Sequence, residues 1–182
     1  MQALSSNSQA VLLKLAGDSI QSWLDTQKLP FFETSLDELR QPAGCFVTLR
    51  SSGALRGCIG TFEASQALYQ NVMRMAVSGA FEDFRFPPVK TDELPQIRIE
   101  ISVLGPLVKM NSLGELEVGR HGVLIRYGVR TGTYLPEVAV SQGWSGEEFL
   151  RHCAREKAGL APEELARADV FLYEVQKFSE KD

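Results

Sequence analysis

Residue types that provide nucleophilic and acid–base chemistry are scarce in this chain of 182 residues, which has three cysteines and two histidines. Cys58 has Gly57 before it and Gly60 two residues after it, and Arg56 supplies a guanidinium two residues before the thiol. A nearby cation favours the thiolate, and a guanidinium binds carboxylate or phosphate through paired hydrogen bonds. We therefore consider two roles for Cys58: a reactive or ligand-facing thiol, or a small buried residue in a strand whose glycines are needed for packing.

His121 is the histidine better placed for chemistry, because it lies between Gly119 and Gly122. Together with Cys58 it gives the nucleophile–base combination that the sequence offers. The alternative is a turn histidine that is hydrogen-bonded to the backbone. No closely spaced set of His and Cys residues indicates a metal site, and any cofactor is left unidentified.

The segment from Glu82 to Phe86 places two carboxylates and an arginine just before a pair of prolines. In one hypothesis Arg85 binds an anion and Asp83 or Glu82 takes or gives a proton. In the other, a carboxylate pairs with Arg85 to fix the loop, while Phe84 and Phe86 fill the core. The residues alone leave both hypotheses open.

The elements that position these residues follow from hydrophobic periodicity. Apolar residues at helical spacing predict a helix over residues 8–23, and two short apolar runs around a Ser-Gly turn predict a hairpin within 44–61 that contains Cys58. A second helix, capped by Ser65, is expected to end before Phe84, since proline disfavours helical geometry in the residue before it.

The second half of the chain alternates strands with helices. Residues 97–104, 122–127, 131–135 and 170–178 have the pattern of strands, Pro136 fits the first turn of a helix, and Ser145 begins a capping box. Hairpins with interspersed helices predict an α+β fold with antiparallel sheets. No repeat or linker divides the chain, so we expect a single domain over residues 1–182.

Charge and composition narrow the class of protein. With 19 Lys and Arg against 23 Asp and Glu, the net charge of −4 argues against a nucleic-acid partner. The longest apolar runs fall far short of the ~20 residues that span a bilayer, and the N-terminus lacks the pattern of a signal peptide, so we expect no membrane partner. The short apolar runs predict a soluble protein, and the odd number of cysteines without a CxxC motif predicts a reduced, cytoplasmic one.

Four segments together resemble the AMMECR domain family, whose members include AmmeMemoRadiSam system protein A. They are residues 55–61 (LRGCIGT), 83–88 (DFRFPP), 117–122 (EVGRHG) and 133–138 (TYLPEV). The resemblance implies an α+β fold of two subdomains with antiparallel sheets flanked by helices, the N- and C-terminal regions sharing the larger one. It also implies that the LRGCIG segment lies near a cleft between the subdomains. Phe84 departs from the family pattern, and an aromatic there would narrow or cover the adjoining surface.

The resemblance implies no established activity, but it implies Memo-like and radical-SAM proteins as partners in an undefined modification pathway. Our main hypothesis is therefore a ligand-binding or accessory component. Arg56 and Arg85 would recognise a small anionic ligand, Gly57 and Gly60 would allow its close approach, and Cys58 and His121 would line the pocket. One alternative is a cysteine-dependent enzyme with Cys58 as nucleophile, His121 as base and Glu82 or Asp83 as orienting or proton-transfer group. Another is a protein–protein interaction module.

Overall fold

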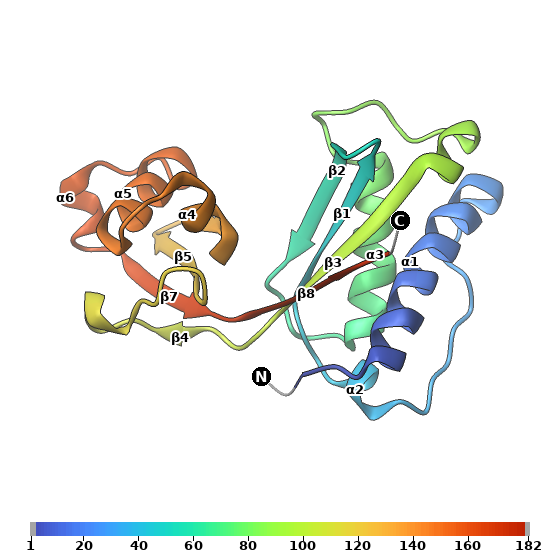
Figure 1. Cartoon of the computed structure of the whole chain (residues 1–182), viewed down its shortest axis with the longest axis horizontal. Coiled ribbons are helices and arrows are strands. Elements are labelled where there is room, and N and C mark those ends of the chain that lie inside the picture. The colour runs from blue at the N-terminus through green and yellow to red at the C-terminus, as the bar shows by residue number, and fades with distance from the viewer. Residues whose placement is uncertain (1–2, 181–182) are drawn as a thin grey trace. The chain divides into compact units, whose positions relative to one another are not determined.

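The computed structural model describes residues 3–180, which form two compact units, each with its own four-stranded sheet and its own hydrophobic core. The smaller unit is Gly105–Val175, and the larger unit combines residues 3–104 with 176–180. The antiparallel pairing within both sheets and the interspersed helices confirm the predicted α+β class, including the larger subdomain shared by the two ends of the chain (Figure 1). The single domain over residues 1–182 stays a prediction.

The larger unit contains the Cys58 segment. Its helices are α1 (Ser6–Thr26), α2 (Asp37–Arg40) and α3 (Leu68–Phe81), with the 3-10 helix η1 (Thr91–Gln96), and its strands are β1 (Cys45–Ser51), β2 (Ala54–Thr61), β3 (Ile97–Leu104) and β8 (Val175–Ser179). The strand order is β2-β1-β3-β8, which makes β2 an edge strand.

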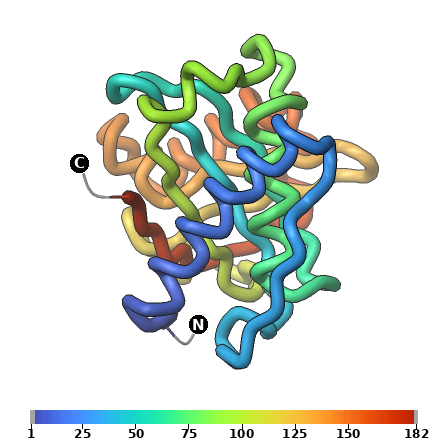
Figure 2. Tube along the Cα trace, turned by 90° about the vertical axis from the view of Figure 1, so that its right-hand side faces the viewer, coloured from blue at the N-terminus to red at the C-terminus, as the bar shows by residue number. Residues whose placement is uncertain are grey.

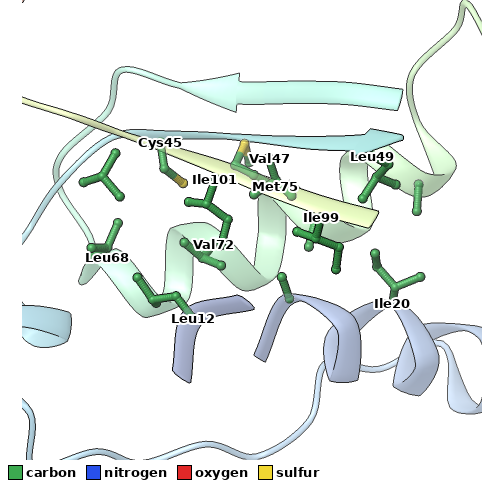
Figure 3. Packing of buried hydrophobic residues seen from close by; sticks show 14 of the residues in the cluster. Leu12, Ile20, Cys45, Val47, Leu49, Leu68, Val72, Met75, Ile99 and Ile101 are labelled. Carbon is green, nitrogen blue, oxygen red and sulfur yellow. The ribbon is translucent and has the colours of Figure 1, made fainter. Parts of the chain in front are cut away.

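Helices α1 and α3 lie side by side on one face of this sheet (Figure 2). Successive strand residues point to opposite faces, so Val47 and Leu49 of β1 and Ile99 and Ile101 of β3 are all buried toward the helices (Figure 3). The residues between them, Thr48 among them, therefore belong to the opposite face of the sheet.

The hairpin that joins β1 to β2 contains a β-bulge. Leu49 pairs with Gly57, but the next residue, Arg50, pairs with Leu55, so Arg56 is the extra residue on β2. The bulge interrupts the strict alternation of side chains at Arg56.

The smaller unit has the strand order β4-β7-β5-β6. Its strands are β4 (Val108–Lys109), β5 (Gly122–Tyr127), β6 (Arg130–Tyr134) and β7 (Asp169–Tyr173), and its helices are α4 (Pro136–Gln142), α5 (Gly146–Glu156) and α6 (Pro162–Leu165), with the 3-10 helix η2 (Leu113–Glu115). The capping box predicted at Ser145 is confirmed, because Ser145 Oγ accepts the N–H of Glu148 and the Glu148 carboxylate accepts the N–H of Ser145.

Two predictions about the elements were wrong. Residues 170–178 are not one strand: β7 and β8 belong to different sheets, because the chain returns to the larger unit after Val175. Ser65 does not cap α3: its hydroxyl donates to Glu63, and Ala67, held in a bridge with Pro42, is the N-cap residue. Within residues 3–180, no helix has the length and apolarity needed to cross a bilayer.

Candidate functional site

Cys58 lies on the edge strand β2, with its side chain on the face turned away from α1 and α3. Its Sγ is 3.2 Å from Oγ1 of its cross-strand partner Thr48. Cys45 and Cys153 are buried, and burial raises the pKa of each thiol to about 12. Of the three cysteines, all of which fall within the described residues, Cys58 is the one that is partly exposed and hence open to chemistry.

The backbone of Cys58 is held by two side chains from the loop after α3. The Cys58 N–H donates to Asp83 Oδ2 (2.9 Å), and Arg85 Nη2 donates to the Cys58 carbonyl (3.2 Å). Arg85 also donates to Asp83 from Nη2 (2.7 Å) and from Nε (2.9 Å). An edge strand leaves outward N–H and C=O groups unpaired within its sheet, so the Asp83–Arg85 pair supplies at Cys58 what another strand would supply.

The charge state of this pair limits what it can do. The Asp83 side chain is only 2% exposed, whereas that of Arg85 is 45% exposed. Hydrogen bonds from Arg85 hold the pKa of Asp83 far below its ordinary value, although burial acts the other way, and the same pairing raises the pKa of Arg85. Asp83 is therefore ionised at neutral pH and suited to positioning Cys58 and Arg85 rather than to proton transfer.

Glu82, the other carboxylate predicted for the site, is exposed at the end of α3.

Arg56 and Arg85 bind different carboxylates. Arg56 donates to Glu93 from Nε (2.7 Å) and from Nη2 (3.3 Å), and its side chain is 13% exposed. The hydrogen bond from Arg56 is the main cause that lowers the pKa of Glu93. Among the described residues, nothing accepts a hydrogen bond from the buried Nη1 of Arg56. Joint binding of one anion by Arg56 and Arg85 stays a prediction.

The two glycines beside Cys58 have close neighbours. A Cβ on Gly57 would lie 2.1 Å from the carbonyl oxygen of Gly79 in α3, and a Cβ on Gly60 would lie 2.2 Å from the Phe46 ring. Packing therefore requires glycine at both positions, whatever ligand approaches them.

His121 belongs to the smaller unit, whereas Cys58 belongs to the larger one. Its Nδ1 accepts the N–H of Glu117 at 3.1 Å, so the neutral ring has its proton on Nε2. To act as a base through Nε2, the ring would have to give up this hydrogen bond. His121 also lines a cavity of about 360 Å³, together with Val108 and Leu172. The pairing of His121 with Cys58 stays a prediction.

The residues predicted for the site are thus brought together only in part. Cys58, Asp83 and Arg85 share hydrogen bonds. Sequence reasoning missed Thr48 and Glu93; the hairpin register would have found Thr48, but no sequence signal identifies Glu93 as the partner of Arg56.

The proposal that both phenylalanines of the loop fill the core was wrong for Phe84. Phe84 is 95% exposed, whereas Phe86 is partly buried beside Arg85, whose guanidinium lies 5.6 Å from the ring centre. Two prolines follow directly, and this short loop leaves Phe84 in solvent while Asp83 turns inward to Cys58.

The fold and the site define a class of protein: a two-unit α+β protein in which an edge strand bears a half-buried cysteine between glycines and an Asp–Arg pair fixes that strand. Comparison with known proteins then gives the family. The AMMECR1 family model matches residues 13–178, and the chain belongs to this family. The resemblance drawn from the four sequence segments is therefore confirmed.

Relatives match the chain over nearly its whole length. It is 40% identical over 180 residues to Protein Mbar_A1807 of Methanosarcina barkeri, covering 93% of this chain and 89% of the relative. It is 36% identical to Protein MK0488 of Methanopyrus kandleri, covering 94% and 87%. The crystal structure of the uncharacterized protein PH0010 from Pyrococcus horikoshii is similar, with a TM-score of 0.86 at 33% identity, covering 94% of this chain and 90% of that one.

Proposed function

We propose that this protein is a binding component that works beside other proteins, and that the loop with Phe84 and Arg85 holds an anionic group of a partner. The observation on which this rests is the fixed but half-exposed guanidinium of Arg85. Its Nε and Nη2 are held by Asp83 and by the Cys58 carbonyl, whereas no hydrogen bond within residues 3–180 involves its Nη1. A donor that is already oriented loses little entropy when it binds a carboxylate or phosphate.

Phe84 supports the same proposal. A phenylalanine that is 95% exposed presents its whole ring to water, next to an oriented arginine. Aromatic residues and arginine are enriched in protein interfaces, where a few such side chains provide most of the binding energy. The pair therefore fits a partner that offers an apolar pocket beside an acidic group.

The geometry favours binding over cysteine-dependent catalysis. Asp83 is ionised and fully engaged with Arg85 and Cys58, and His121 uses Nδ1 to accept a backbone hydrogen bond. An enzyme that uses His121 as base through Nε2 would need the ring to give up this hydrogen bond.

The partners we propose are the Memo-like and radical-SAM proteins that family membership implies, within their shared modification pathway. We place this function in the cytoplasm. In support, Cys45, Cys58 and Cys153 are all unpaired thiols, as reducing compartments favour.

The test is a titration of the full chain with a purified Memo-like protein and with a purified radical-SAM protein from the same source, followed by calorimetry. Phe84→Ala should weaken binding at least about tenfold, because it removes an exposed anchor without disturbing the core. Phe31→Ala is the matched control, since Phe31 is 88% exposed in the same unit. The proposal would be refuted if neither protein bound the chain, or if Phe84→Ala and Phe31→Ala bound with equal affinity.

A further inference from the structure

Two arginines occupy paired positions on adjacent strands in the sheet of the larger unit. Arg50 of β1 pairs directly with Arg98 of β3 in the antiparallel register. Their neighbours Leu49 and Ile99 are buried beneath α1 and α3, so both arginines belong to the opposite face of the sheet. Like charges directly opposite each other in a sheet are destabilising, and we call these two residues the Arg50–Arg98 pair.

No carboxylate of the described residues lies within ion-pair distance of either guanidinium. Arg50 Nη1 donates only to the Gly53 carbonyl, at 3.4 Å. Arg98 Nη1 donates to the carbonyls of Pro95 and Ile97, at 3.2 Å each. Within residues 3–180, Nε and Nη2 of both side chains make no hydrogen bond and could donate to a ligand.

Three carboxylates near this pair, either in the chain or in the sheet, have other partners. Glu93 binds Arg56, Glu100 binds Lys177 at 2.9 Å, and the carboxylate of Glu180 accepts the backbone N–H of Ile99. These three carboxylates are therefore engaged elsewhere, and two arginines remain at paired positions of adjacent strands without an ion-pair partner among the described residues. In a protein with a net charge of −4, this local excess is not part of a general basic surface.

We propose that the Arg50–Arg98 pair binds the dianionic phosphoryl group of a small molecule. Guanidinium groups match the oxygens of a phosphate through paired hydrogen bonds. Two uncompensated guanidiniums call for a charge of −2, which a phosphate monoester has and a single carboxylate lacks. Binding would also remove the repulsion within the pair. The proposal uses no residue of the Cys58 site and does not depend on the function proposed above.

Inorganic phosphate is the probe, and urea unfolding of the full chain is the measurement. Phosphate replaces chloride at constant ionic strength, so that general screening stays the same. With a Kd of about 2 mM, 20 mM phosphate should lower the unfolding equilibrium constant about tenfold. This effect should vanish in Arg50→Gln and in Arg98→Gln, and both variants should be at least as stable as the original protein in chloride alone.

Arg74→Gln is the matched control, because Arg74 is an exposed arginine on α3 of the same unit, and its Nη1 donates to Gln66. It should keep the full response to phosphate. An equal response in the original protein and in Arg98→Gln, or a loss of the response in Arg74→Gln, would overturn the proposal. If Arg98→Gln does not fold, Arg50→Gln gives the same comparison, and calorimetric titration of phosphate into the original protein decides directly whether it binds.

Discussion

Asp83 is the residue on which the arrangement around Cys58 depends. It is buried, it is ionised, and it accepts hydrogen bonds from the backbone of Cys58 and from both the backbone and the side chain of Arg85. A buried carboxylate is tolerated only when such partners replace water. Arg85 and the Cys58 N–H therefore lose their fixed positions together if this carboxylate is removed.

Asp83→Asn should cost about 2 kcal/mol of unfolding free energy at neutral pH, a modest figure because water screens the half-exposed Arg85. The pKa of Asp83 is depressed in the folded state, so its contribution is complete above the unfolded value near ~3.9 and is lost as the pH falls below it. Between pH 6 and 3 the original protein should lose about 1 kcal/mol more than the variant. Urea unfolding of the original protein and of the variant across this range measures both differences in unfolding free energy. If the two stabilities changed with pH in parallel, the pKa of Asp83 would not be lowered in the folded state.

The three thiols should differ in reactivity according to their burial. Native protein treated with a thiol-specific reagent should be labelled quickly at Cys58, while Cys45 and Cys153 react only on unfolding, because burial raises the pKa of both to about 12. Cys58→Ser should abolish the fast phase, and Cys45→Ser should leave it intact. A pH profile of this phase also tests the enzyme alternative: labelling that persists at low pH would favour an activated thiolate, and fast labelling of Cys153 would contradict the burial argument.

At the scale of elements, the close approach of β2 to α3 sets the position of Cys58. The helix lies against the strand where glycine faces glycine, Gly57 on β2 and Gly79 on α3. The same helix ends at Phe81, so that the loop with Asp83 reaches back to the edge of β2. If α3 lay farther from β2, Asp83 could not reach the backbone of Cys58.

Gly57→Ala should therefore destabilise the protein by about 3 kcal/mol, because its Cβ would lie 2.1 Å from the backbone oxygen of Gly79. Gly17→Ala is the control within α1: its Cβ would meet Ile99 at an ordinary 3.7 Å, and alanine should add up to about 1 kcal/mol there. Chemical denaturation of both variants measures the difference. Equal stabilities would mean that the helix shifts away from β2 without cost.

At the scale of the whole molecule, the chain forms one unit from a continuous segment and the other from both of its ends. The smaller unit, Gly105–Val175, has a core of its own that includes Phe149, Val123 and Leu172. The larger unit needs β8 to cover the outer edge of β3. The two units therefore differ in what they need in order to fold.

A fragment of residues 105–175 should fold by itself, with cooperative thermal unfolding by circular dichroism, because its strands and core are contiguous in sequence. A fragment of residues 1–104 lacks β8 and should aggregate, since β3 then has an unpaired edge. Adding the segment 176–182 as a peptide should reduce that aggregation. A random-coil spectrum for 105–175 would contradict this account.

The sequence by itself determined the elements whose pattern records their own burial. Alternation in 97–104 gave β3, the Ser-Gly turn gave the β1–β2 hairpin, and the Ser145 capping box gave the start of α5, because periodicity and capping are local properties. The hairpins with interspersed helices indicated the α+β class, and the family resemblance implied the larger unit that both ends of the chain share.

Tertiary structure alone decided which groups meet. It divided residues 170–178 between two sheets, and it paired Arg56 with Glu93, which is distant in the sequence. It also placed the Asp83–Arg85 pair on the backbone of Cys58. The physical reason is that an ion pair or an edge contact depends on distance in space, which hydrophobic patterning does not record. The sequence thus identified Cys58 as the candidate residue, and the fold determined that its backbone is held by Asp83 and Arg85.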